Sequence, residues 1–209
     1  MNLQFDAYIF DLGGVILNID YKKTIKAFKK LGVKNIDKIY SQAQQNHIFD
    51  DFETGKISAQ EFREYIKSQS SIELNDTQID DAWNAMLLDL PKDRIELLLQ
   101  LRKGHKIFLY SNTNAIHLKA FKHIIKQQYG DENLLETIFN QTYYSHLIGK
   151  RKPHPEGFLQ IINDHNLNPK TTFFIDDTYQ HVKGAKKVGL KTFWLKKRDV
   201  FLLFCVFFS

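Results

Sequence analysis

Five short, mainly apolar segments recur along this sequence, and stretches with helical periodicity fill most of the gaps between them. The segments occupy residues 5–10, 106–110, 139–144, 171–175 and 191–195. Uninterrupted apolar runs of this length are typical of strands that are covered on both faces, as in a parallel sheet. The alternation of strands and helices therefore predicts an α/β fold, built on a doubly wound parallel sheet of five strands.

Glycine residues mark where several of the intervening helices are expected to end. The helical pattern of residues 93–103 stops before Gly104, and two later patterns stop at Gly130 and Gly189. Glycine readily adopts the left-handed conformation that commonly ends a helix, so these positions are natural stop signals.

The stretch from residue 20 to residue 90 differs from the rest because it contains no convincing strand. Within it, Ser58 and Glu61 have the spacing of a capping box, in which each residue satisfies a backbone amide of the other at the start of a helix. We expect an all-helical insertion over residues 20–90, between a first core segment (1–19) and a second (91–209).

A further helix of the insertion is expected to begin at Asn75 or Asp76 and to end before Pro91. Its apolar face would carry Ile79, Trp83, Met86 and Leu87. The insertion as a whole is interpreted either as a separate lid or as extra helices packed on the sheet.

Composition narrows the functional classes. With 209 residues the chain is one domain, or one domain with an insertion, and its net charge of +5 is too small to argue for nucleic-acid binding. The single cysteine, Cys205, excludes a disulfide framework. The N-terminal residues lack the basic segment and apolar run of a signal peptide, so we expect a cytoplasmic protein. The apolar run 200–208 is too short to span a membrane.

Polar residues follow the first two predicted strands. Asp11 leaves the first strand and is followed by Gly13 and Gly14, while Ser111 and Asn112 end the second strand just before a helix. Ligands of open α/β sheets gather at the carboxyl ends of strands, and a helix N-terminus attracts anions. Both observations have a simpler interpretation. Asp11 could be an ordinary turn residue, and Ser111 and Asn112 could belong to an ordinary helix cap.

Asp176 and Asp177 stand side by side at the end of the fourth predicted strand. Adjacent carboxylates repel each other unless a cation or hydrogen bonds compensate them. Mg²⁺ prefers oxygen ligands and often binds through one or two carboxylates together with a substrate phosphate. The pair is therefore a candidate Mg²⁺ site, with a turn and helix cap as the alternative.

Lys152 lies in a basic loop before the fourth strand, and Pro153 and Pro155 follow it. The prolines restrict the backbone around this lysine, so its ammonium group is a candidate for a fixed position. A positioned ammonium can stabilise a bound phosphate, whereas the simpler interpretation is a solvated loop.

This order of motifs, with Asp11, Ser111, Lys152 and the pair Asp176 and Asp177, resembles the haloacid dehalogenase-like hydrolase superfamily, which includes many phosphatases. The resemblance covers nearly the whole chain and implies a Rossmann-like core, with the first and fourth strands as neighbours. An insertion after the first motif corresponds to the helical C1 cap of subfamily IA. The segment that begins with Asp11 is also similar to a branch that includes α-glucose-1-phosphate phosphatases.

The resemblance implies a role for each motif in phosphate transfer. Asp11 would be the nucleophile and form an aspartyl-phosphate, which water then hydrolyses. Ser111 and the backbone amide of Asn112 would bind the phosphoryl oxygens, and Lys152 would neutralise charge beside them.

A Mg²⁺ cofactor is also implied by the resemblance. It would be held by Asp11, by the backbone carbonyl of Gly13 and by Asp177 as a direct ligand. Asp176 would act through a water molecule or as an orienting group.

Some positions depart from the family pattern. Most family phosphatases have a second aspartate, their general acid and base, where this chain has Gly13, and losing such a group can cost about 10²–10⁴-fold in rate. His181 stands where asparagine often supports the acidic loop, and it can still donate one hydrogen bond. In the insertion, Glu53 and Lys56 are candidates for contacts with the substrate.

The favoured function is a Mg²⁺-dependent phosphatase of a small phosphorylated metabolite, with sugar phosphates as the preferred class. Gly13 motivates one alternative, a catalytically weak metabolite-binding or regulatory protein. A metal-free haloacid dehalogenase is the other alternative, against which the paired carboxylates argue. We expect a monomer or homodimer without nucleic-acid partners, in which the apolar tail contacts the sheet edge or another molecule.

Overall fold

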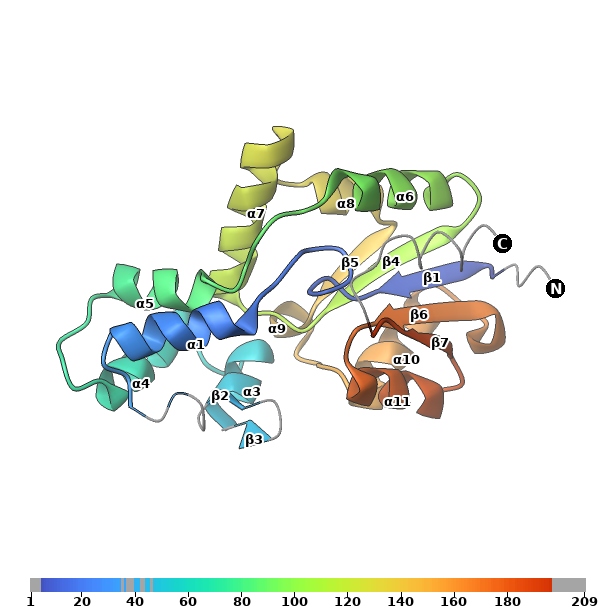
Figure 1. Cartoon of the computed structure of the whole chain (residues 1–209). Helices are drawn as coiled ribbons and strands as arrows, with labels where there is room; N and C mark the ends of the chain where they lie inside the picture. The colour runs from blue at the N-terminus through green and yellow to red at the C-terminus, as the bar shows by residue number, and fades with distance from the viewer. Residues whose placement is uncertain (1–4, 35, 37–39, 42–43, 46, 197–209) are drawn as a thin grey trace.

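The computed structural model describes residues 5–34, 36, 40–41, 44–45 and 47–196, and its centre is a five-stranded sheet (Figure 1). The strands are β1 (Ala7–Phe10), β4 (Lys106–Ser111), β5 (Gln141–Tyr144), β6 (Thr172–Asp176) and β7 (Lys191–Trp194). They lie in the order β5, β4, β1, β6, β7, and every neighbouring pair is parallel. The predicted α/β fold is confirmed, as is the adjacency of the first and fourth core strands.

Helices cover both faces of the sheet because the side chains of its strands alternate between two apolar clusters. Tyr8 and Phe10 of β1 belong to one cluster, and Ala7 and Ile9 belong to the other. The first cluster includes side chains of α6 (Lys92–Arg102), α7 (Ala115–Tyr129) and α8 (Leu134–Ile138). The second includes side chains of α10 (Pro155–Asp164) and α11 (Tyr179–Lys187), on the opposite side in Figure 1.

The insertion forms a lobe beside the sheet with an apolar cluster of its own (Figure 1). Its helices are α1 (Tyr21–Lys30), α3 (His47–Glu53), α4 (Ala59–Gln69) and α5 (Asp76–Asn84). Phe28, Phe62 and Trp83 from three of these helices are almost fully buried against one another. The lobe therefore has its own hydrophobic core.

The predicted helix starts in the insertion agree with the structure. Ser58 and Glu61 form both hydrogen bonds of a capping box at the start of α4. Asn75, rather than Asp76, caps α5, and the Gln78 side chain completes a second capping box there. These local signals were readable in the sequence because caps depend on residues only three positions apart.

One part of the insertion departs from the expectation of an all-helical segment. Strands β2 (Tyr40–Ser41) and β3 (Gln44–Gln45) form a two-stranded antiparallel ribbon. Each strand is only two residues long, so no alternation of apolar and polar residues could reveal it.

The two connections between the insertion and the sheet run side by side. Asn18 and Asp20 donate backbone hydrogen bonds to Asp89 and Met86, and Leu88 donates one back to Asn18. The prediction that α5 also carries Met86 and Leu87 was wrong, because this helix ends at Asn84 and the chain then pairs with the other connection.

Helix α7 packs against both the sheet and the insertion. Its Ile116 belongs to the apolar cluster of the insertion, and its His117 ring stacks on Trp83 of α5 at 4.7 Å between centroids. His117 Nε2 lies 3.1 Å from the Trp83 carbonyl oxygen, and His117 Nδ1 lies 3.2 Å from Nδ2 of the Asn114 side chain. These contacts give His117 as a neutral ring that donates from Nε2 and accepts at Nδ1.

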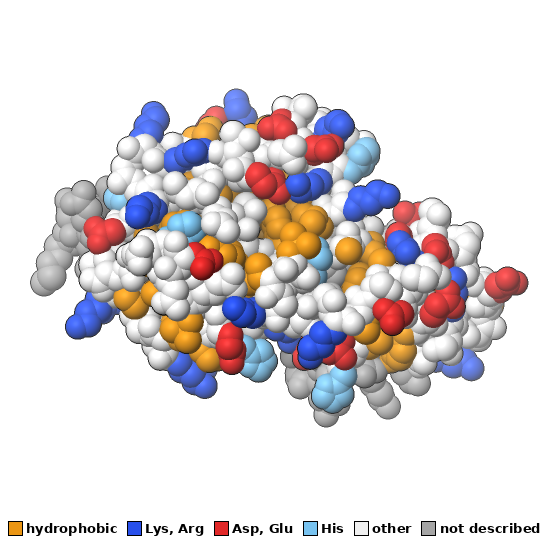
Figure 2. All heavy atoms as spheres, turned by 180° about the vertical axis from the view of Figure 1, so that it is seen from behind, with side chains coloured by type: hydrophobic (Ala, Val, Ile, Leu, Met, Phe, Trp, Pro, Cys, Tyr) orange, Lys and Arg blue, Asp and Glu red, His pale blue; other side chains and the backbone are white. Residues whose placement is uncertain are grey.

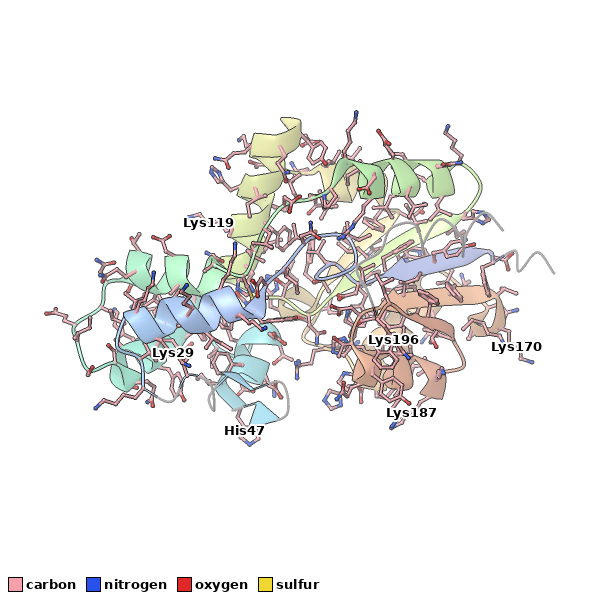
Figure 3. All side chains as sticks on the ribbon, viewed as in Figure 1. Lys29, His47, Lys119, Lys170, Lys187 and Lys196 are labelled. Carbon is pink, nitrogen blue, oxygen red and sulfur yellow. The ribbon has the colours of Figure 1, made fainter. Side chains whose placement is uncertain are left out.

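The basic side chains of the surface are distributed over both lobes. On the face in Figure 2, Lys and Arg side chains are interspersed with Asp and Glu. Those labelled in Figure 3 come from different elements, such as Lys29 of the insertion, Lys119 of α7 and Lys187 of α11. On the face shown, the small positive charge is therefore not gathered into one patch.

The other elements among the described residues are short, namely α9 (Ser145–Ile148) and a 3₁₀ helix (Pro169–Thr171). Within the part of the chain that the structure describes, no helix combines the length and the apolar character needed to cross a bilayer. The C-terminal run 200–208, with Cys205, lies outside the described residues.

Candidate active site

The carboxyl ends of the three central strands bring the sequence-predicted site residues together. Phe10 of β1 is in register with Leu109 of β4 and with Ile175 of β6. The residues that follow these positions, among them Asp11 and Asp176, therefore emerge at the same edge of the sheet. Segments more than a hundred residues apart in sequence meet here because parallel neighbours end on the same side.

Lys152 is the centre of a buried network at this edge. Its ammonium nitrogen lies 2.6 Å from Asp11 Oδ1 and 2.8 Å from Asp176 Oδ2. The same nitrogen donates to the Tyr110 carbonyl oxygen at 2.8 Å, so all three of its protons have acceptors. The side chain is completely buried, which fixes the ammonium between the two carboxylates.

Asn112 holds the backbone of this lysine. Its Oδ1 accepts from the Lys152 amide at 2.9 Å, and its Nδ2 donates to the Lys152 carbonyl oxygen at 3.0 Å. The sequence assigned only the backbone amide of Asn112 to the site, and this role of its side chain was missed. No local signal marks it, because the two residues are 40 positions apart.

The electrostatics of the network follow from burial and from an excess of carboxylates. Burial, and then the neighbouring carboxylate of Asp176, raises the pKa of Asp11 to about 8, against the opposing effect of Lys152. Burial alone would lower the pKa of Lys152, but Asp11 and Asp176 raise it, so its ammonium stays charged. Burial likewise opposes ionisation of Asp176, yet Lys152 and His181 hold the pKa of Asp176 below its ordinary value.

Three carboxylates at this edge fit a hard divalent cation. One oxygen each of Asp11, Asp176 and Asp177 lies within 4.8 Å of the others. The Lys152 ammonium is a single positive charge beside these three carboxylates, so a divalent cation bound among them would meet an attractive field. An all-oxygen donor set is the kind that Mg²⁺ prefers.

Gly14 permits the close approach of Asp177 to the first strand. Its φ is +78°, and a Cβ atom at this position would lie 2.0 Å from Asp177 Oδ2. Any side chain at residue 14 would therefore displace the Asp177 carboxylate. The second glycine of the motif is therefore required by the close approach of Asp177.

His181 supports the acidic pair from the first turn of α11. Its Nδ1 lies 3.1 Å from Asp176 Oδ1 and 3.0 Å from Oδ2. The hydrogen bond expected from this histidine is therefore directed at Asp176. Asp176 is thus held by both Lys152 and His181, whereas Asp177 contacts the Thr178 hydroxyl.

A cavity of about 470 Å³ opens at this cluster. Its polar end is formed by residues of the strand ends and of the lysine loop, namely Asp11, Gly13, Ser111, Asn112 and Lys152. Its apolar lining residues include Ile19, Tyr21, Phe49, Met86, Leu87 and Phe121. The cavity therefore combines charged groups, suited to phosphate, with apolar side chains, some of which the insertion contributes.

The two candidates from the insertion behave differently. Glu53 lines the cavity at the end of α3. Lys56 points to solvent, with its side chain 70% exposed and its ammonium 3.2 Å from Asp51. The structure thus brings Glu53, but not Lys56, to the cavity wall.

Comparisons with known proteins find hydrolases and phosphatases. A family model described as haloacid dehalogenase-like hydrolase matches residues 5–189. The chain is 32% identical to D-ribitol-5-phosphate phosphatase of Bacteroides thetaiotaomicron over 186 residues, which cover 88% of this chain and 89% of that protein. A shorter match, 29% identical over 53% of this chain and 43% of the relative, is to glyceraldehyde 3-phosphate phosphatase of Pyrococcus furiosus.

Solved structures agree with these matches. A variant of an enzyme of the same family from Bacteroides thetaiotaomicron, in complex with magnesium and inorganic phosphate, is 37% identical, with a TM-score of 0.83. The alignment covers 90% of this chain and 93% of that one. L-2-haloacid dehalogenase of Xanthobacter autotrophicus, which is 18% identical over 90% of this chain and 76% of its own with a TM-score of 0.60, shares the fold.

Proposed function

This chain belongs to the haloacid dehalogenase-like hydrolase family, and from that premise we propose that it is a Mg²⁺-dependent phosphatase of a small phosphorylated metabolite. The observation that carries the proposal is the buried Lys152 ammonium, which bridges Asp11 and Asp176 beside Asp177. The names of two relatives, a ribitol phosphate and a glyceraldehyde phosphate phosphatase, support a sugar or polyol phosphate as substrate.

Asp11 is the proposed nucleophile. Its free carboxylate oxygen attacks phosphorus, the bond between phosphorus and the ester oxygen breaks, and the alcohol leaves with a proton from solvent. Water then attacks the aspartyl-phosphate, which releases inorganic phosphate and regenerates the carboxylate. The Lys152 ammonium 2.6 Å from Oδ1 keeps Asp11 oriented and favours its ionised form.

Ser111 and the backbone amide of Asn112 are the proposed phosphate-binding groups. Both residues line the cavity beside Asp11, just before the N-terminus of α7. Donors held in place by a strand end stabilise charge that develops on the phosphoryl oxygens in the transition state.

The residues proposed to hold Mg²⁺ are Asp11, Asp177, Asp176 and the carbonyl oxygen of Gly13. A bound Mg²⁺ supplies Lewis-acid stabilisation of phosphoryl charge. Asp177 is the proposed direct ligand. Asp176 is the proposed orienting residue, because Lys152 and His181 already occupy its oxygens.

Gly13 leaves no side chain to protonate the departing oxygen from the position that family phosphatases use. The enzyme is therefore proposed to depend on solvent, or on an acidic leaving group, for that proton. The same residue motivates the second candidate, a protein that binds phosphorylated metabolites and hydrolyses them poorly.

Residues 20–90 are proposed to form a lid over the cavity, with the core made of residues 1–19 and 91–209. The paired connections around Asn18 and Leu88 support this division, since both pass through one hydrogen-bonded strip. The Tyr21 and Phe49 side chains of the lid contribute to the cavity wall, so the lid excludes water from part of the site.

The experiment is a phosphate-release assay on a panel of sugar and polyol phosphates, with Mg²⁺ and with a chelator, for the wild type and Asp11→Asn. We expect turnover that requires Mg²⁺ and is abolished by the substitution. Full activity of Asp11→Asn, or equal rates in chelator, would contradict the proposal. Tight binding of these esters without turnover would favour the second candidate.

A further inference from the structure

We propose that Trp194 is a positioning residue for Mg²⁺ binding, because its indole N–H fixes the backbone of Asp177, the proposed direct ligand. Trp194 is the last residue of β7, the edge strand beside β6 in Figure 1. Its Nε1 donates to the Asp177 carbonyl oxygen at 3.0 Å. The inference rests on the proposed phosphatase function and deepens it, because it assigns a role to a residue outside the group of described residues that line the cavity.

The end of β7 holds the backbone of both members of the acidic pair. Trp194 is in register with Asp176, and the amide of Leu195 donates to the Asp176 carbonyl oxygen at 3.0 Å. The register of the two strands ends at this position, and Asp177 follows in the short connection between β6 and α11. The indole therefore holds a carbonyl group that lies one residue beyond the backbone pairing of the strands.

The Asp177 carboxylate occupies a position with little tolerance. A Cβ atom on Gly14 would lie 2.0 Å from Asp177 Oδ2, so this oxygen lies in space that only glycine leaves open. The Thr178 hydroxyl donates to Asp177 Oδ1 at 3.1 Å, and the Thr178 amide donates to Asp176 Oδ1 at 2.7 Å. A shift of this connection would disturb all of these contacts, and Mg²⁺ demands near-ideal placement of its ligands.

Burial in the core does not account for a tryptophan at residue 194. Among the described residues, the two apolar clusters of the sheet do not include Trp194, which is 37% exposed. Its ring packs on Tyr179, the first residue of α11, with 4.7 Å between centroids, and the Lys196 ammonium lies 4.7 Å from the indole centroid. The bond to Asp177 uses the N–H group, which a phenyl ring lacks.

The expected effect is on metal affinity rather than on the chemical step. The bond orders the backbone of Asp177 before a metal ion arrives, so that less conformational freedom is lost when the ion binds. Asp11, Ser111 and Lys152, the groups proposed to act on phosphate, make no printed contact with the indole within the described part of the chain. Loss of the N–H should therefore raise the Mg²⁺ requirement and leave the rate at saturating Mg²⁺ nearly unchanged.

The test compares Trp194→Phe, which keeps an aromatic ring and loses the N–H, with Lys196→Ala, a matched control that removes the ammonium from the ring and keeps the N–H. Titration calorimetry measures Mg²⁺ binding to the metal-free proteins, and hydrolysis of p-nitrophenyl phosphate is followed against Mg²⁺ concentration. We expect Trp194→Phe to raise the Kd for Mg²⁺ and the half-maximal Mg²⁺ concentration about 3–10-fold. The kcat of Trp194→Phe at saturating Mg²⁺, and the Mg²⁺ affinity of Lys196→Ala, should change less than about twofold.

Two results would overturn the inference. One is an unchanged Kd for Mg²⁺ in Trp194→Phe, even if thermal melts in chelator show a lower Tm, since Trp194 would then serve stability alone. The other is an equal rise of the Kd in Lys196→Ala, which would assign the effect to the surroundings of the ring and not to its N–H. Either result is compatible with Mg²⁺-dependent hydrolysis by the wild type. Conversely, a rise of the Kd confined to Trp194→Phe supports the role of Trp194 even if no ester is hydrolysed.

Discussion

The side chain of Asn112 forms two hydrogen bonds with the backbone of Lys152: its Oδ1 accepts from the Lys152 amide at 2.9 Å, and its Nδ2 donates to the Lys152 carbonyl oxygen at 3.0 Å. Asn112 follows a central strand, whereas Lys152 lies in a loop before α10. The pair thus ties the loop to the rigid sheet, and it does so at the residue whose ammonium contacts Asp11.

Asn112→Ala is expected to lower kcat about tenfold with a smaller change in KM. The reason is that the backbone of Lys152 loses both of its hydrogen bonds with the Asn112 side chain, so the ammonium is less well positioned for charge stabilisation. Steady-state kinetics with p-nitrophenyl phosphate, alongside a thermal melt, measures the effect. An unchanged kcat in a folded variant would show that other contacts suffice to hold Lys152.

Lys152→Met is expected to destabilise the metal-free protein by about 3–5 kcal/mol, because it leaves Asp11 and Asp176 buried without their counter-charge. Chemical unfolding in chelator measures the loss of unfolding free energy. Added Mg²⁺ is expected to restore part of the stability and almost none of the activity. A variant as stable as the wild type in chelator would contradict the account of this network.

Gly14→Ala is expected to raise the Mg²⁺ concentration required for half-maximal activity at least tenfold, because its Cβ atom would displace Asp177. Gly130→Ala is the matched control, since Gly130 also has a positive φ, +82°, but a Cβ atom there would meet no atom within 4 Å. Both variants carry the backbone strain of about 1–2 kcal/mol. Equal Mg²⁺ requirements in the two would mean that strain, and not the contact with Asp177, is responsible.

His117 makes stability depend on pH. Burial lowers the pKa of His117 from its ordinary value of 6.5 to about 4, so between these values the unfolded chain binds a proton that the folded protein does not. The contribution of the neutral His117 ring to the free energy of unfolding is fully present above about pH 6.5. It is lost as the pH falls towards 4, and the total loss is roughly 3 kcal/mol.

His117→Gln should accordingly flatten the fall in unfolding free energy between pH 6.5 and 4, whereas His123→Gln, on the exposed side of the same helix, should not. Denaturant titrations at saturating Mg²⁺ across this range make the comparison. Parallel curves for the wild type and His117→Gln would contradict the buried neutral ring.

Several features of the site were predictable because they depend on local sequence and on the general geometry of parallel sheets. Apolar runs located the strands, and Asp11 and Asp176 follow two of them directly. Since parallel neighbours end at one edge, the convergence of these carboxylates followed once the family resemblance implied that the first and fourth strands are neighbours. Helix caps such as Ser58 could also be predicted, because the residues that form a cap are close in sequence.

Other features depend on contacts between distant residues, which no local pattern encodes. The bonds of Asn112 to Lys152 and of Arg151 to Glu53 require knowledge of how two loops pack. The early end of α5 arises because the connection after it pairs with the chain around Asn18. Compartment and oligomeric state stay predictions.

The most direct test of Asp11 as the nucleophile is rapid acid quenching of the enzyme during turnover of a ³²P-labelled substrate, followed by peptide mapping. The account predicts an acid-stable, hydroxylamine-sensitive label on the peptide that contains Asp11, formed only with Mg²⁺ and absent from Asp11→Asn. Label on another residue, or turnover in which no labelled enzyme accumulates and Asp11→Asn remains active, would contradict it.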